Sequence, residues 1–135
     1  MISLRPIEII GGGLAGLSLG IALRRAGVPV EVFEAGDYPR HRVCGEFIAG
    51  LTSPTLARLG LAPLLADALP HREVAWFMQE NPVRVQRLPS PALGISRYVL
   101  DARLATAFAA AVGVLHTHKG VSDTSTRPGD VLATG

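Results

Sequence analysis

Residues Gly11–Gly16 form the pattern G-x-G-x-x-G, the arrangement in this chain best suited to binding chemistry. The pattern follows the apolar run Ile7–Ile10 and precedes an Ala/Leu-rich segment. This is the strand–turn–helix context of a dinucleotide-binding loop. Glu34 closes a second apolar run, where a carboxylate can accept hydrogen bonds from ribose hydroxyls. We therefore predict a site for the adenosine and pyrophosphate end of a dinucleotide.

The positions of this loop have different roles. Gly11 permits a tight turn, Gly13 lets a pyrophosphate approach the backbone, and Gly16 lets the helix pack closely on the strand. The free N–H groups and the dipole at the start of the helix then face the phosphates. The residues predicted to contact the nucleotide are Gly11, Gly13, Leu14, Ala15, Gly16, Glu34 and Ala35. A glycine-rich turn that binds no ligand is the alternative.

The cofactor class follows from the residues after Glu34. No basic residue stands directly beyond it, since the next three are Ala35, Gly36 and Asp37. A 2′-phosphate needs a nearby cation, so this arrangement argues against NADP at the site.

Length and composition limit the class of protein. The chain has 135 residues, enough for one domain with its own core, and its net charge of +2 is small and scattered. We expect no nucleic-acid partner. Glycines interrupt the apolar stretch 7–23, which is also short for a bilayer span, so we expect no stable membrane insertion. The single cysteine, Cys44, fits a reducing compartment, and the cytoplasm is the default location.

The pattern of apolar residues and turn formers predicts an α/β fold that begins with a β–α–β unit. The loop 35–48 and a linker at Pro89–Gly94 separate the other elements. The expected helices are Leu14–Ala26, a short one starting at Ser53-Pro54 and ending at Gly60, Pro63–Leu69, and Asp101–Val112 with Asp101 as its cap. The expected strands are Ile7–Ile10, Val30–Phe33, Val74–Gln79, Val83–Arg87, Val114–His116 and Val131–Thr134.

Several further segments resemble one family. They are the run Arg40–Phe47, which contains Arg-x-Cys-Gly-Glu, the end of the Leu56–Leu61 helix, the run Ile95–Leu104, which contains Arg-x-x-Leu-Asp, and Val131–Gly135. Together with the glycine loop they resemble the N-terminal FAD-binding part of FAD-dependent oxidoreductases. The most similar subgroup contains geranylgeranyl reductases and aromatic-ring flavin monooxygenases.

The resemblance implies a Rossmann-like FAD/NAD(P)-binding domain with a parallel sheet. It also implies that the small β-hairpin insertion within residues 70–92 belongs to an incomplete substrate domain. On this basis we treat residues 1–135 as one FAD-binding domain. Family members continue beyond the Ala-Thr-Gly turn into a second flavin motif and a substrate-binding sheet, so the sequence indicates a truncated member.

The resemblance also implies site residues. Arg42 would reach the adenosine or pyrophosphate part of FAD, and Arg97 would approach the cofactor from the linker before its helix. Guanidinium groups pair well with phosphates, although either arginine could instead be solvated at the surface. Cys44 and Gly45 would lie beside the flavin and shape its pocket. For Cys44 we expect a structural or pocket-lining role and not redox or nucleophilic chemistry, because a free cysteine is often simply buried.

No catalytic residue or metal site can be assigned. His116 and His118 point the same way along a strand, but no third ligand lies near them in the sequence. Ser18, Ser53 and Ser96 lack a nucleophile motif. In flavoenzymes this is expected, because the flavin carries the redox chemistry.

Three alternatives for function remain. The chain is an FAD-binding oxidoreductase fragment that resembles flavin monooxygenases or reductases, with NAD(P)H as electron donor and a small organic substrate in the full-length context. It is a small FAD- or NAD-binding module whose partner chain supplies the missing half. Or it is a non-catalytic remnant that binds nothing tightly. Whether the chain itself is an enzyme is left open.

Overall fold

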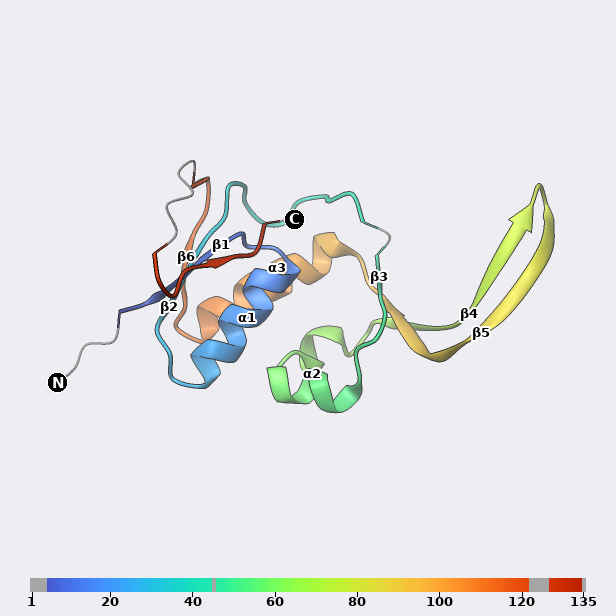
Figure 1. Cartoon of the computed structure of the whole chain (residues 1–135), viewed down its shortest axis with the longest axis horizontal. Coiled ribbons are helices and arrows are strands. Elements are labelled where there is room, and N and C mark those ends of the chain that lie inside the picture. The colour runs from blue at the N-terminus through green and yellow to red at the C-terminus, as the bar shows by residue number, and fades with distance from the viewer. Residues whose placement is uncertain (1–4, 45, 122–126, 135) are drawn as a thin grey trace.

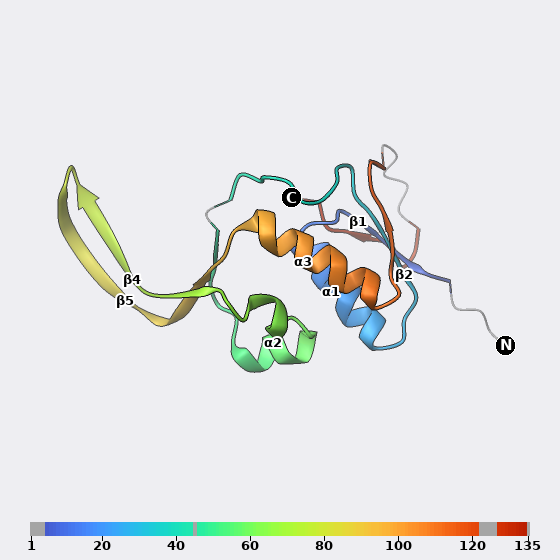
Figure 2. The ribbon, with the colours of Figure 1, turned by 180° about the vertical axis from the view of Figure 1, so that it is seen from behind.

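The computed structural model describes residues 5–44, 46–121 and 127–134. It has a compact α/β body and a long β-hairpin that projects away from it, as both views show (Figures 1 and 2). The body begins with β1 (Ile7–Ile10), α1 (Leu14–Arg25) and β2 (Val30–Phe33). These bounds confirm the predicted β–α–β unit. Gly27 follows α1 with φ of +80°, the left-handed conformation expected where a glycine ends a helix.

The body is built on a parallel sheet with the strand order β6-β2-β1-β7, where β6 is Val114–His116 and β7 is Val131–Leu132. Ile9 of β1 is paired with Val32 of β2 and with Val131 of β7. The central strand β1 therefore takes its two neighbours from widely separated parts of the sequence. The carboxyl ends of β1 and β2 lie at the same edge of the sheet, where parallel α/β sheets bind their ligands.

Two helices, α1 and α3 (Arg97–Ala110), pack against each other over this sheet. Phe108 of α3 is fully buried and lies against Gly20 of α1, where a Cβ atom would be only 2.8 Å from its ring. The Gly20 position thus allows the two helices to approach each other closely. The rest of the core comes from apolar residues of the sheet and helices, including Ile9, Leu17, Ile21, Val32, Leu100 and Leu104.

A second, antiparallel sheet has the order β3-β5-β4. Its strands are β3 (Phe47–Ile48), β4 (Leu69–Met78) and β5 (Asn81–Gly94). The short strand β3 pairs with the base of β5, and beyond this base the hairpin is an isolated two-stranded ribbon. Between the body and the hairpin lie α2 (Ser53–Leu59) and the 3₁₀ helix η1 (Ala62–Leu65).

Several predicted elements differ from the structure. The predicted strands 74–79 and 83–87 are too short, because β4 and β5 pair over a longer range, and the turn falls at Gln79-Glu80 before Asn81 begins β5. The linker predicted at Pro89–Gly94 is wrong, since these residues belong to β5. The prolines lie where the pairing with β4 is interrupted, between Arg87 and Ala92, and such an interruption tolerates residues without an N–H donor.

The helix starts also differ. Helix α3 begins at Arg97 after Ser96, so the prediction that Asp101 caps it is wrong: Asp101 lies inside the helix and is fully buried. For α2 the cap is Thr52, whose hydroxyl accepts from the Thr55 N–H, while Gly60 ends the helix as predicted. The helix predicted over 63–69 is a 3₁₀ helix over 62–65. The loop predicted over 35–48 ends in the short strand β3. The strand predicted over 131–134 is limited to residues 131–132.

Candidate functional site

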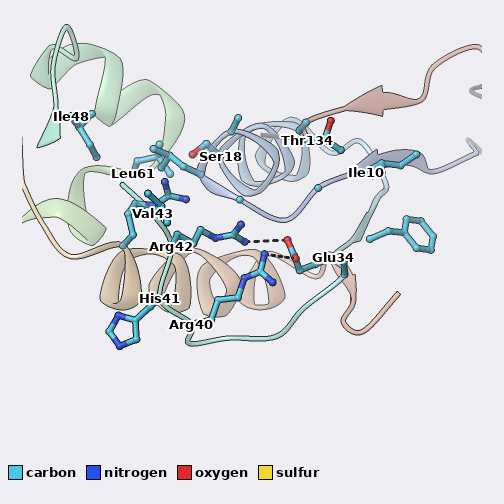
Figure 3. Close-up of a pocket in the computed structure, with 18 of the residues that line it drawn as sticks. Ile10, Ser18, Glu34, Arg40, His41, Arg42, Val43, Ile48, Leu61 and Thr134 are labelled. Carbon is cyan, nitrogen blue, oxygen red and sulfur yellow. Dashed lines mark hydrogen bonds and ion pairs between the residues drawn. The ribbon is translucent and has the colours of Figure 1, made fainter. Parts of the chain in front are cut away.

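A cavity of about 1070 Å³ lies at the carboxyl ends of β1 and β2, where the glycine loop turns into α1 (Figure 3). One part of its wall is polar and contains the loop, Glu34, Arg42 and Arg97. The opposite part is apolar and comes mainly from β3, α2 and η1 through Ile48, Leu51, Leu59, Leu61 and Leu65. The cavity can therefore hold a ligand that is charged at one end and apolar at the other.

The glycines of the loop are not equivalent. At Gly11, which has φ of +110°, a Cβ atom would collide with the backbone oxygen of Ala133, and at Gly16 it would collide with the Gly11 oxygen. These two positions let backbone segments touch. At Gly13 the nearest atom to such a Cβ is Nη2 of Arg97, at 3.9 Å, so the space beside this residue is open to the cavity.

Gly13 also stands at the N-terminus of α1, directly before its first residue, Leu14. The first N–H groups of an α-helix have no partner within the helix and carry the positive end of its dipole. One turn further along α1, the Ser18 hydroxyl also lines the cavity, and it is the one buried side-chain polar atom for which the described residues supply no hydrogen-bond partner. This wall of the cavity thus offers donors for a polar, anionic ligand.

Glu34 is nearly buried and holds the loop in place. Its Oε2 accepts from the Gly12 N–H at 2.9 Å, and its Oε1 accepts from the Gly36 N–H at 2.9 Å. Arg40 and Arg42 approach the same carboxylate at 3.0 and 3.3 Å, as the dashed lines in Figure 3 show. Burial alone raises the pKa of Glu34, but the Gly36 N–H, the two guanidinium groups and the Gly12 N–H together lower it below its usual value of 4.5. The carboxylate is therefore ionised at neutral pH.

Tyr38 closes the loop from the side of Glu34. Its hydroxyl donates a hydrogen bond to the backbone oxygen of Gly12. Burial, with the nearby Glu34 charge, raises the pKa of Tyr38 well above its usual value, so the hydroxyl stays protonated and remains a donor. Gly12 is thus held on both sides, by a phenol at its oxygen and a carboxylate at its N–H.

A second carboxylate, Asp101, binds two of the arginines that line the cavity, Arg42 and Arg97. Its oxygens accept from Nε and Nη2 of Arg97 at 2.8 and 3.0 Å, and from Nε of Arg42 at 2.8 Å. The hydrogen bond to Asp101 is the main reason why the pKa of Arg97 is raised. A chain of alternating charges, Glu34–Arg42–Asp101–Arg97, therefore runs along the polar wall.

The structure brings most of the predicted site residues together. Gly11, Gly13, Leu14, Ala15, Glu34, Ala35, Arg42 and Arg97 all line the cavity, and Gly16 packs directly beneath the loop. Cys44 is exposed and does not line this cavity, although its sulfur is 3.8 Å from Nη1 of Arg97. Gly45 and Gly135 lie outside the described residues.

Sequence reasoning missed the apolar wall of the cavity and three residues of its hydrogen-bond network, Tyr38, Arg40 and Asp101. Arg40 and Tyr38 stand in the loop after β2, where spacing carries no information about which side chains turn back toward Glu34. Asp101 had a signal, because Arg97 and Asp101 are four residues apart and so share one face of a helix. That signal was overlooked because Asp101 was interpreted as a helix cap.

His116 of β6 and the nearby His118 each contact an acidic side chain and do not share a common site. Nε2 of His116 lies 2.8 Å from Oε2 of Glu31 and its ring stacks on Phe33, and Nε2 of His118 lies 3.5 Å from Oδ2 of Asp37 at the surface. In the described ranges 5–44, 46–121 and 127–134, no three His, Cys, Asp or Glu side chains are grouped as a metal site. Nor does any helix in these ranges combine the length and apolar character of a membrane span.

Comparison with known proteins agrees with this geometry. Residues 9–45 match the NAD(P)-binding Rossmann-like domain family. The fold matches a 2-methyl-3-hydroxypyridine-5-carboxylic acid oxygenase with a TM-score of 0.74 and 23% identity, over 87% of this chain and 32% of the oxygenase. It also matches p-nitrophenol 4-monooxygenase from Pseudomonas putida with a TM-score of 0.78 and 17% identity, over 94% and 35% of the two chains.

The chain therefore has the fold of one part of these two oxygenases. The flavin-dependent monooxygenase PieE, solved with FAD and substrate, has a TM-score of 0.70 at 22% identity and matches 87% of this chain. In sequence, the menaquinone reductase of Mycobacterium tuberculosis is 29% identical over 102 residues, which are 73% of this chain and 25% of the reductase. The resemblance stated from the sequence is confirmed. The chain spans about a quarter of the length of the curated relatives it matches.

Proposed function

We propose that this chain binds the ADP moiety of FAD and is the nucleotide-binding part of a flavin-dependent monooxygenase or reductase. The observation that carries the proposal is the open space at Gly13, between the N-terminus of α1 and Arg97. A diphosphate there would accept hydrogen bonds from backbone N–H groups and from a guanidinium group, the two donors that bind phosphates best. When bound, the flavin would supply the redox chemistry.

The ribose of the adenosine would lie at Glu34. Both carboxylate oxygens already accept backbone N–H groups, and Arg40 and Arg42 are the two side chains that share them. Arg42 is also held by Asp101, whereas Arg40 is more exposed and folds over Gly36. We therefore expect ribose hydroxyls to replace Arg40, not Arg42, on the Glu34 carboxylate.

The remaining parts of the proposal concern the whole protein. The hairpin of β4 and β5 would belong to a substrate domain, and residues 1–135 would act as one FAD-binding unit. The substrate would be a small organic molecule and NAD(P)H the electron donor, in a reducing compartment such as the cytoplasm. The redox activity and the organic substrate are proposed because the chain is similar to parts of an oxygenase, a monooxygenase and a reductase.

Titration calorimetry with FAD and with ADP tests the proposal. The variant Gly13→Val fills the open space while the backbone conformation, with φ of −83°, suits any residue. We expect it to weaken ADP and FAD binding by about tenfold to 100-fold, because it blocks the charge-assisted hydrogen bonds to the diphosphate. Its stability should change little.

The control is Ala109→Val, which adds a similar branched side chain on the exposed surface of α3. It should leave both affinities unchanged. If the parent protein bound neither ADP nor FAD, or if Gly13→Val bound both as well as the parent, the proposed site would be wrong.

A further inference from the structure

Asp101 is a fully buried carboxylate that does not reach the cavity itself. It lies in α3 with no exposed surface, while the arginines that it binds, Arg42 and Arg97, both line the cavity. A buried charge is costly unless it is paired and hydrogen-bonded. Within the described part of the chain, the side-chain hydrogen bonds of Asp101 go to these two guanidinium groups, which lie 59 and 4 residues from it in the sequence.

The contacts determine which nitrogen atoms remain for a ligand. Arg42 uses Nε for Asp101 and Nη2 for Glu34. Arg97 uses Nε and Nη2 for Asp101, in a two-bond geometry that fixes the plane of the guanidinium group. Asp101 therefore holds both arginines, and Nη2 of Arg97 lies 3.9 Å from the position that a Cβ atom at Gly13 would occupy.

Without an anion between them, two adjacent guanidinium groups repel each other and each long side chain regains its rotamer freedom. We propose that Asp101 is the positioning residue that holds Arg42 and Arg97 in the orientation needed to bind a diphosphate. This inference rests on the proposed function, because it concerns the same cavity. It assigns to Asp101 a role in ligand affinity although the residue would not touch the ligand.

Positioning and simple charge predict opposite effects, which makes the proposal testable. The network of ion pairs beside the cavity joins Arg40, Arg42, Arg97, Glu34 and Asp101, which carry three positive and two negative charges. If Asp101 acted only through its charge, the neutral variant Asp101→Asn would raise the net positive charge and bind ADP more tightly. If Asp101 acts by positioning the arginines, the same variant binds ADP more weakly.

The experiment is an ADP titration of the parent protein, Asp101→Asn and Asp67→Asn. Asp67 is the matched control, because it also binds an arginine of α3, Arg103, through both oxygens at 2.5 and 2.8 Å, but at the exposed surface away from the site. We expect Asp101→Asn to weaken ADP binding about tenfold and Asp67→Asn to leave it unchanged. Unchanged or tighter binding by Asp101→Asn would overturn the proposal.

A second measurement does not depend on a ligand or on the folding of the variant. In the parent protein, NMR of the arginine Nε–H groups should show slowly exchanging signals for Arg42 and Arg97, which Arg42→Lys and Arg97→Lys assign by removing one signal each. In Asp101→Asn, where it folds, both signals should broaden or exchange rapidly. Rapid exchange of both signals in the parent would contradict the inference.

The two measurements also separate the two proposals. If the parent protein bound no ADP, the proposed function would fail, and the Nε–H signals alone would decide whether Asp101 holds the arginines. If the parent bound ADP and Asp101→Asn bound it equally well, only the inference about Asp101 would fail.

Discussion

The body and the β4–β5 hairpin of this protein differ in how their apolar side chains are used. In the body, residues of β1, β2, α1 and α3 form one continuous core. In the hairpin, large apolar side chains such as Trp76, Phe77 and Val85 are exposed, and only Ala92, close to the base, is buried. Both regions carry apolar residues, but only the body buries most of them in a shared core.

This difference shows where the stability and the binding site of the chain reside. A two-stranded ribbon without a packed face adds little stability of its own, whereas buried side chains in a close-packed core contribute several kcal/mol each. The cavity is built from the body together with β3, α2 and η1 at the hairpin's base, and no residue of the projecting part of the hairpin lines it. We expect the projecting part to be removable without loss of the site.

The largest expected effect is in the core. Phe108→Ala should lower the free energy of unfolding by about 3–5 kcal/mol, because Phe108 is fully buried between α1 and the turn at Gly113. Trp76→Ala removes a larger ring from the hairpin and should lower it by less than about 1 kcal/mol. Urea unfolding followed by circular dichroism measures both. Equal losses would contradict the distinction between the two regions.

The next effect concerns the charged wall of the body. Glu34→Gln should lower the free energy of unfolding at neutral pH by about 1–3 kcal/mol, because the Gly12 and Gly36 N–H groups and two arginines lose an ionised partner. The folded-state pKa of Glu34 lies below 4.5, so its contribution is present above pH 4.5 and is lost as the pH falls through that lowered pKa.

Comparing urea unfolding at neutral pH and at about pH 3 checks the sign of this effect. The difference between Glu34→Gln and the parent should shrink at the lower pH, where the parent carboxylate begins to be protonated. Glu31→Gln is the control, because Glu31 lies in β2, three residues before Glu34, and its side chain is more exposed. A difference that stayed constant or grew on acidification would contradict the prediction.

A shortened hairpin sharpens the comparison further. Glu73 of β4 pairs with Arg87 of β5, so residues 74–86 can be replaced by Asn-Gly, which favours a two-residue hairpin turn. The free energy of unfolding should change by less than about 1 kcal/mol, and the affinity for ADP should stay the same. Loss of ADP binding by a folded variant would show that the projecting part supports the site.

The smallest effect on stability is expected at the tip of the hairpin. Phe77 and Met78 are both exposed there. Their replacement by threonine keeps strand propensity and should change the free energy of unfolding by less than about 0.5 kcal/mol. The solubility should nevertheless rise, because exposed apolar strand residues favour association. Precipitation with ammonium sulfate measures this, with Arg72→Thr and Glu80→Thr as a polar control pair.

Local signals made the β–α–β unit predictable. The glycine loop, the apolar runs of β1 and β2, and Gly27 lie close together in the sequence, and the structure has these elements at nearly the predicted bounds. The hairpin was predicted too short, because its alternation of apolar and polar residues breaks at Pro89 and Pro91. Backbone pairing nevertheless resumes beyond these prolines, at Ala92 and Leu93.

The site was only partly predictable for a related reason. The spacing of Gly11, Gly13 and Glu34 identified one wall, since those residues belong to one contiguous unit. The contact of Arg42 with Asp101 joins residues that are 59 positions apart, and the contact of Arg40 with Glu34 depends on how a loop folds back. Neither contact follows from a repeat or a helix period, so only the fold reveals them.

The position of β7 has a consequence for the biosynthesis of the site. The Ala133 N–H donates to the Ile10 oxygen at 2.7 Å, and the Ala133 oxygen lies directly against Gly11. A ribosome releases Gly11 long before Ala133, so in a nascent polypeptide the loop lacks this support until Ala133 has been synthesised. The loop of the proposed nucleotide site therefore gains this support only after residues 131–133 have emerged.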